Sequence, residues 1–223
     1  AWTIIKLAGS FIILGLPIYF LIAMYHDKGS ITKTNEVLSY LVLATEKFFF
    51  PFSMKNKIIN ALGELKGKFV LEYGCGVGSL TKRLAPKVGE KGKIIATDLT
   101  LHNVQIADKR TKKINHVSVL HHPHLNSFKL KLPKKVDLVL SIGMLSYMQN
   151  PQQILKHLAT KVKKGGKIVF LDYDKFFYLI PNVDWIESPE MLEQTFKKAG
   201  FKVIVQRKRS LFWTYVLVTG VKV

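Results

Sequence analysis

Three glycines at alternate positions, Gly74, Gly76 and Gly78, stand where an apolar run gives way to a helical pattern. The run from Phe69 to Leu71 predicts a buried strand, and the acid Glu72 follows it directly. Beyond the glycines, apolar residues recur on one helical face, at Leu80, Leu84 and Val88. Glycine permits left-handed backbone at such a turn and lets a ligand lie against the main chain. The turn is therefore predicted to hold a small molecule.

A second acid, Asp98, ends the next predicted strand, Lys93–Asp98. A carboxylate at that place can accept hydrogen bonds from both hydroxyls of a ribose. A dinucleotide-binding fingerprint would need glycine where Ser79 stands, so the Gly-x-Gly-x-Gly spacing differs from that motif. The two acids and the glycines together predict a ribose-containing ligand.

The run from Lys68 to Thr100 resembles the class I S-adenosylmethionine (AdoMet) methyltransferases, and the resemblance covers residues 56–223. It implies that Glu72 and the three glycines contact the methionine moiety and that Asp98 holds the ribose. Further cofactor contacts are expected at Cys75, Leu99, His122, Ser141 and Ile142. A structural glycine turn in another nucleotide-binding sheet, such as that of a dehydrogenase, is the alternative interpretation.

Two residues are candidates for contact with the methyl acceptor, Tyr147 and Asp172. Both follow predicted strands, and sites in open α/β sheets lie beyond the carboxyl ends of the strands. Tyr147 could orient the acceptor or form an ordinary pocket wall. Asp172, with Asp174, could bind an amine or act as a general base, or could instead cap a turn or pair with lysines. The Asn/Asp-Pro-Pro-Tyr motif of methyltransferases that act on base amino groups is absent after Ser141, which makes a nucleic-acid substrate less favoured.

The run His121-His122-Pro123-His124 resembles a metal-binding cluster only superficially. Its spacing gives no tetrahedral ligand set, so no metal site is predicted. Related enzymes often carry an acid near the adenine here, and this chain has no carboxylate between Asn115 and Lys135. Backbone groups or His122 are therefore expected to contact the adenine.

Predicted strands alternate with predicted helices along residues 56–223, which indicates a mainly parallel sheet. The expected fold is α/β, a Rossmann-like seven-stranded sheet, mostly parallel, with an antiparallel terminal strand. Gly165 and Gly166 are expected to end a helix before the fifth strand, Lys167–Asp172. Ser188 and Pro189 are expected to begin a later helix, whose inward residues are expected to be Met191, Leu192 and Phe196. The other predicted strands are 117–120, 136–141, 201–206 and 211–218, the last two in a hairpin.

The amino-terminal part divides into a membrane anchor, residues 1–28, and an interfacial or lid segment, residues 29–55. The stretch from residue 7 to residue 25 carries no charge and, at about 1.5 Å per residue, nearly matches a hydrocarbon core of about 30 Å. Lysines cluster after it, which places the catalytic domain on the cytoplasmic side of a single-pass anchor. A cleaved signal peptide and a buried helix are the alternatives. Residues 37–52 suit an amphipathic helix in the headgroup region or a lid over the cofactor.

Charge and composition limit the function further. Thirty-four Lys and Arg against fifteen Asp and Glu give a net charge of +19, which attracts polyanions such as anionic lipids or RNA. The one cysteine excludes an internal disulfide. The apolar segments favour a lipid or lipophilic acceptor, such as a phospholipid amine, a quinone or a thiol, at the lipid bilayer. The alternatives are a protein or RNA methyltransferase held at the membrane and a non-catalytic scaffold with the same fold.

Overall fold

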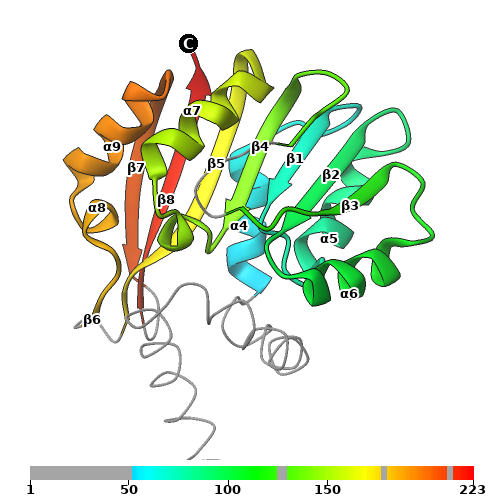
Figure 1. The fold of residues 1–223 in the computed structure, drawn as a ribbon, viewed down its shortest axis with the longest axis horizontal. Helices are drawn as coiled ribbons and strands as arrows, with labels where there is room; N and C mark the ends of the chain where they lie inside the picture. The colour runs from blue at the N-terminus through cyan, green and yellow to red at the C-terminus, as the bar shows by residue number, and fades with distance from the viewer. Residues whose placement is uncertain (1–51, 125–129, 177–179, 210–212) are drawn as a thin grey trace, which may run out of the picture. The chain divides into compact units, whose positions relative to one another are not determined.

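The computed structural model describes residues 52–124, 130–176, 180–209 and 213–223 (Figure 1). The predicted anchor at residues 7–25 lies outside the described residues, and so does the predicted amphipathic segment except for Phe52. Among the residues that the structure describes, no helix is both long enough and apolar enough to cross a membrane.

A single mixed sheet forms the centre of the described domain. Its strands lie in the order β3 (Val117–His121), β2 (Lys93–Asp98), β1 (Phe69–Tyr73), β4 (Val136–Ile142), β5 (Val162–Phe176), β8 (Trp213–Lys222) and β7 (Phe201–Arg209). Strands β1 to β5 run parallel, and β8 runs antiparallel to both β5 and β7. A short strand, β6 (Ile180–Pro181), pairs with the end of β5. The predicted seven-stranded Rossmann-like sheet with its antiparallel terminal strand is confirmed.

Helices cover both faces of this sheet, so a separate hydrophobic cluster lies on each face. Strand β1 is buried throughout, and successive side chains point to opposite faces. Phe69, Leu71 and Tyr73 join one cluster, which packs against α7 (Pro151–Lys161) and α9 (Pro189–Lys198). Val70 joins the other, which packs against α4 (Phe52–Leu62), α5 (Ser79–Val88) and α6 (Leu101–Thr111). Figure 1 shows α7 and α9 on the near face.

The start of β5 differs from the prediction. Helix α7 ends at Lys161 and β5 begins at the next residue, so Gly165 and Gly166 lie inside the strand rather than at a helix end. The register shifts there, from Val136 opposite Val162 to Leu138 opposite Lys167. Gly165 takes a φ of 72°, and a Cβ on Gly166 would lie 2.8 Å from the Lys163 carbonyl oxygen. The glycines therefore serve an irregularity in β5, which the strand pattern alone did not indicate.

The carboxyl-terminal helix and hairpin form as predicted, although β7 extends to Arg209 and β8 runs from Trp213 to Lys222. Ser188 caps α9, because its Oγ accepts a hydrogen bond from the Met191 amide over 3.2 Å. Leu192 and Phe196 are buried as expected. Met191 is 49% exposed, so the expectation that it faces inward is wrong. Burial recurs along α9 at Leu192 and Phe196, four residues apart, and Met191 lies beside that stripe.

Candidate active site

The glycine loop connects β1 to α5, and each of its glycines has a left-handed backbone. The φ angles are 83° at Gly74, 53° at Gly76 and 77° at Gly78, a region that other residues rarely adopt. A Cβ on Gly78 would lie 2.9 Å from the Ala107 Cβ, and one on Gly74 would overlap the Met144 side chain. A Cβ on Gly76 would meet nothing within 4 Å. The outer glycines thus permit close packing, and the middle one leaves its backbone open.

Asp98 lies directly beside the open glycine. Its Oδ2 accepts a hydrogen bond from the Gly76 amide over 2.7 Å, and its Oδ1 accepts from the Thr100 amide over 2.9 Å and from Asn103 Nδ2 over 3.1 Å. Burial raises the pKa of this carboxyl, and the three hydrogen bonds oppose that rise. The structure therefore brings together the loop and the acid that the sequence placed on separate strands.

Glu72 is a buried acid at the base of the same loop. Its Oε2 accepts a hydrogen bond of 2.6 Å from the Thr81 hydroxyl, which lies in the first turn of α5. The Glu72 carbonyl oxygen accepts one of 3.2 Å from the Thr97 hydroxyl on β2. The carboxylate thus links the end of β1 to the helix that begins after the glycines.

Two further residues of the predicted cofactor site, Cys75 and Leu99, are buried. Burial raises the pKa of the Cys75 thiol, and the nearby carboxylates of Asp98 and Glu72 raise it further. A thiol that remains protonated is a poor nucleophile, so the geometry agrees with a packing role for Cys75.

His122 lies at the end of β3 against the same site. Its amide donates a hydrogen bond of 2.9 Å to the Asp98 carbonyl oxygen, and its ring meets Tyr73 edge-on with the centroids 6.3 Å apart. Burial lowers the pKa of His122 to about 4, and the neighbouring His124 contributes to this shift. The imidazole is therefore neutral at physiological pH. No group of three or more potential metal ligands occurs in the described part of the chain.

Ser141 and Ile142 end β4, next to β1 in the sheet. The Ser141 hydroxyl donates a hydrogen bond of 2.6 Å to the Tyr73 carbonyl oxygen, so this side chain joins the ends of two strands. Ile142 is partly buried. Met144 follows, and its side chain lies against Gly74. The segment after β4 therefore borders the glycine loop.

Asp172 is buried behind the short helix η2 (Leu145–Tyr147), which carries the other predicted catalytic residue, Tyr147. Its Oδ2 accepts a hydrogen bond of 3.1 Å from the Ser146 amide, and its Oδ1 accepts one of 2.8 Å from the Tyr173 amide. Burial raises the pKa of Asp172 to about 7. The carboxyl thus caps the turn that presents Tyr147, which was one of the two alternatives for this acid.

Residues 52–206 match the family model of the methyltransferase domain. The chain belongs to this methyltransferase family. The matched range contains every cofactor and catalytic residue predicted above.

Three curated proteins, two methyltransferases and a carboxymethyltransferase, are similar to parts of this chain. A demethylmenaquinone methyltransferase of Bacillus licheniformis is 29% identical over 53% of this chain and 50% of its own length. A tRNA U34 carboxymethyltransferase of Proteus mirabilis is 30% identical over 66% of this chain and 48% of its own length. A mitochondrial ubiquinone biosynthesis O-methyltransferase of Dictyostelium discoideum is 29% identical over 51% of this chain and 37% of its own length. The chain spans half the length of these relatives or less.

Solved methyltransferase structures share the fold. An AdoMet-dependent methyltransferase of Aquifex aeolicus has a TM-score of 0.62 at 21% identity, over 87% of this chain and 98% of its own. Phosphoethanolamine N-methyltransferase 2 of Haemonchus contortus, in complex with AdoMet, has a TM-score of 0.70 at 15% identity. The match covers 88% of this chain and 60% of that protein's chain. The fold is therefore that of the class I AdoMet-dependent methyltransferases.

Two arginines that connect separate segments near the candidate site or at the end of β5 were missed by the sequence analysis. Arg110, at the end of α6, donates through Nη1 to the Val77 carbonyl oxygen over 2.6 Å and to the Ser79 hydroxyl over 3.0 Å, which holds the glycine loop. Arg207, on β7, forms an ion pair with Asp174. Nearly all basic residues of this chain are lysines. The few arginines could therefore have been singled out from the sequence as candidates for specific hydrogen bonds. A guanidinium can serve several acceptors at once, which lysine cannot do in the same way.

Proposed function

We propose that this protein transfers a methyl group from AdoMet to a lipophilic quinol. The observation that carries the cofactor assignment is the open backbone of Gly76, with the Asp98 carboxylate 2.7 Å from its amide nitrogen. A ligand can approach the main chain there without meeting a side chain, and an acid suited to ribose hydroxyls stands beside it.

The residues present fit the cofactor. Glu72 and the glycines 74, 76 and 78 would hold the methionine part, and Asp98 would hold the ribose. The neutral imidazole of His122, with Leu99, would border the adenine, an apolar surface suited to a flat base. Cys75, Ser141 and Ile142 would shape the remaining wall. When bound, AdoMet supplies an electrophilic methyl, whose transfer to a quinol ring carbon forms a C–C bond, breaks the sulfonium S–C bond and releases S-adenosylhomocysteine and a proton.

The protein's own part in such a reaction is chiefly alignment, since a held acceptor reacts much faster than a free one. Asp172 fixes the Ser146 amide and so the turn that carries Tyr147. Tyr147 would orient the acceptor hydroxyl from that turn. Asp172 would act through Tyr147's turn, because its carboxyl is buried and already bonded to Ser146 and Tyr173.

The choice of acceptor rests on the relatives and on composition. Two of the three relatives reported above are named for quinone biosynthesis. The sequence after β5, from Phe176 to Pro181, is apolar and aromatic, which suits an isoprenoid quinol better than a charged acceptor. The tRNA-modifying relative and the net charge of +19 favour RNA as the second candidate.

Attachment to the lipid bilayer belongs to the same proposal. An isoprenoid quinol resides in the membrane, and the uncharged stretch at residues 7–25 is long enough to reach across its core. The catalytic domain would then lie on the cytoplasmic side. Alkaline carbonate extraction of cells that express the full chain tests this part: the protein should stay in the membrane pellet, and release into the supernatant would contradict an anchor.

One labelling experiment tests the acceptor. The purified full chain is incubated with methyl-labelled AdoMet and, separately, with a short-chain demethylmenaquinol, phosphatidylethanolamine vesicles or total tRNA. Label is expected in the quinol, and at limiting AdoMet it is expected to fall by about tenfold or more in the Asp98→Asn variant. Label in tRNA or in the phospholipid would replace the quinol as acceptor, and no label in any arm would favour a non-catalytic scaffold.

A further inference from the structure

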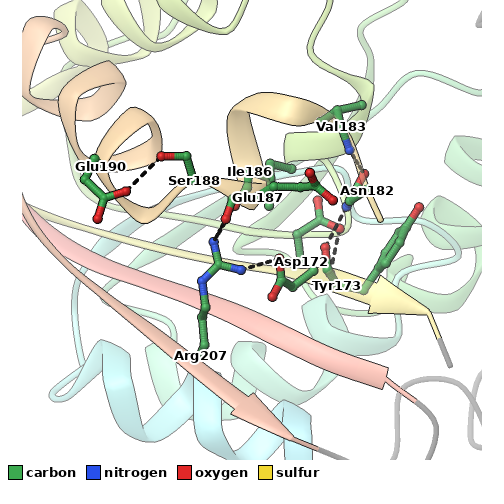
Figure 2. A network of polar contacts seen from close by, with 10 residues as sticks. Asp172, Tyr173, Asn182, Val183, Ile186, Glu187, Ser188, Glu190 and Arg207 are labelled. Atoms are coloured by element: carbon green, nitrogen blue, oxygen red, sulfur yellow. Dashed lines mark hydrogen bonds and ion pairs between the residues drawn. The ribbon is translucent and has the colours of Figure 1, made fainter. Parts of the chain in front are cut away.

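Arg207 on β7 connects two segments at one end of the sheet (Figure 2). Its Nη2 donates hydrogen bonds to the carbonyl oxygens of Ile186 over 2.7 Å and Glu187 over 2.6 Å, at the end of helix α8 (Asp184–Glu187). Its Nη1 forms an ion pair with Asp174 on β5. One guanidinium therefore joins α8 to the carboxyl end of the fifth strand.

Asn182 ties the residues before α8 to the same strand. Its Nδ2 donates a hydrogen bond to the Tyr173 carbonyl oxygen over 2.6 Å, and its amide donates one to the Asp174 carbonyl oxygen over 3.0 Å. Its Oδ1 in turn accepts from the Val183 amide over 2.8 Å. Residues 182–187 are therefore held against β5 at both ends, by Asn182 at the first and by Arg207 at the last (Figure 2).

Residues 182–187 are linked to the glycine loop through two contacts and the short chain segments between them. Asp172, two residues before Asp174 on β5, holds the Ser146 amide. Ser146 lies in η2, two residues after Met144, whose side chain lies against Gly74. Ligands of open α/β sheets bind beyond the carboxyl ends of the strands. Residues 182–187 therefore lie at the carboxyl end of β5, the same edge of the sheet at which the glycine loop follows β1.

One partner of the Arg207–Asp174 ion pair is buried, and the other is partly exposed. The Asp174 side chain is 4% exposed and that of Arg207 is 24% exposed. Removing one partner of such a pair leaves a charge in a poorly solvated place, which is strongly unfavourable. Lysine at position 207 would keep the positive charge, but its ammonium lacks the planar fork that reaches a carboxylate and two carbonyl oxygens together.

We infer that Arg207 is a positioning residue for the methyl acceptor, because it holds α8 against the end of β5 beside the transfer site. This inference rests on the proposed function. It assigns no contact between Arg207 and the reacting atoms. The arginine acts through residues 182–187, and the cofactor side of the site should not depend on it.

The test compares the full-length Arg207→Lys variant with wild type and with Lys208→Gln, a matched control at the exposed neighbouring position of β7. Hydrogen–deuterium exchange at residues 182–187 should be about tenfold faster in Arg207→Lys, because charge-assisted hydrogen bonds to α8 are lost. Calorimetric AdoMet affinity should stay within about twofold of wild type. With a short-chain demethylmenaquinol, KM should rise about tenfold and kcat should fall much less.

Unchanged exchange at residues 182–187 would overturn the inference, as would a loss of AdoMet affinity as large as the rise in KM. If Arg207→Lys does not fold, Asp174→Asn serves instead, because it removes the ion pair through which Arg207 joins α8 to β5. Exchange at residues 184–187 should then rise while AdoMet affinity stays within about twofold of wild type, and unchanged exchange at those residues would overturn the inference. Absence of turnover in the wild-type protein would instead contradict the proposed function, and exchange and AdoMet affinity would still decide whether Arg207 holds α8 independently of the cofactor site.

Discussion

The amide of Gly76 and the carboxylate of Asp98 meet over 2.7 Å, although they belong to different β–α units of the chain. Gly76 carries the only left-handed backbone of the loop at which a side chain would find open space, and Asp98 is the acid beside it. The contact therefore joins the two parts of the proposed nucleoside site.

Asp98→Asn should weaken AdoMet binding by about 10- to 100-fold, because a charged hydrogen-bond acceptor becomes neutral. Asparagine keeps only one acceptor oxygen for the three N–H donors around Asp98, so the free energy of unfolding should also fall, by about 1 to 3 kcal/mol. Calorimetry with AdoMet measures the first effect and urea denaturation the second. Asp108→Asn, at an exposed position on α6, is the matched control and should leave both unchanged. An affinity for AdoMet that stays within a factor of two in Asp98→Asn would contradict the assignment.

Gly76→Ala and Gly67→Ala form a second matched pair. Both glycines have a left-handed backbone, with φ of 53° and 71°, and neither Cβ would meet an atom within 4 Å. Each alanine should therefore cost about 1 to 2 kcal/mol of folding stability through backbone strain alone. Only Gly76→Ala should also weaken AdoMet binding, by about tenfold or more, because only its methyl group would occupy the ligand's space. Equal affinities of the two variants would show that the open backbone is not a ligand surface.

The stability of the fold should depend on pH through Asp172. Burial raises its pKa to about 7 in the folded state, against about 4 in the unfolded chain, so the folded protein binds more protons between these values. This group's contribution to stability is complete below about pH 4 and is lost as the pH rises through 7. The free energy of unfolding of wild type minus that of Asp172→Asn should fall by roughly 3 to 4 kcal/mol between pH 4 and pH 8. Urea denaturation at a series of pH values measures this difference. A difference that stays constant with pH would refute the raised pKa of Asp172.

The lowered pKa of His122 should make the free energy of unfolding depend on pH in the opposite direction. Burial lowers its pKa to about 4, against about 6.5 in the unfolded chain, so the unfolded state binds more protons between these values. Its neutral form stabilises the fold, and stability should rise with pH from about 4 to about 6.5. The difference between wild type and His122→Gln should grow by up to roughly 3 kcal/mol over that range. Because Asp172 and His122 have opposing effects, the wild-type profile alone is a poor test, and a flat difference for His122→Gln would contradict a buried neutral imidazole.

Local patterns predicted most of the fold. The apolar run before Glu72 and the helical spacing of Leu80 and Leu84 predicted β1 and α5, because both patterns report burial directly. The acids and glycines of the proposed cofactor site were predicted from a motif whose residues stand at fixed places relative to strand ends. Ser188 was identified as a cap because the capping bond is formed within one helical turn.

Long-range pairing set the features that the sequence analysis did not predict. The irregularity at Gly165 depends on the register between β4 and β5, which a single strand's pattern does not contain. The Arg207–Asp174 pair joins residues that lie on separate strands, β7 and β5, with β8 between them in the sheet. The role of Asp172 as a cap for η2 likewise needed the fold, because Ser146 lies on a different connection. The sequence could offer these acids as candidates but could not choose between their alternatives.

A crystal structure of the protein with S-adenosylhomocysteine would show whether the nucleoside binds between the glycine loop and Asp98. We expect the ribose hydroxyls within hydrogen-bonding distance of the Asp98 carboxylate and the amino-acid portion along residues 74–78. A ribose bound away from Asp98, a ligand bound elsewhere on the domain, or no binding at saturating concentration would contradict this assignment.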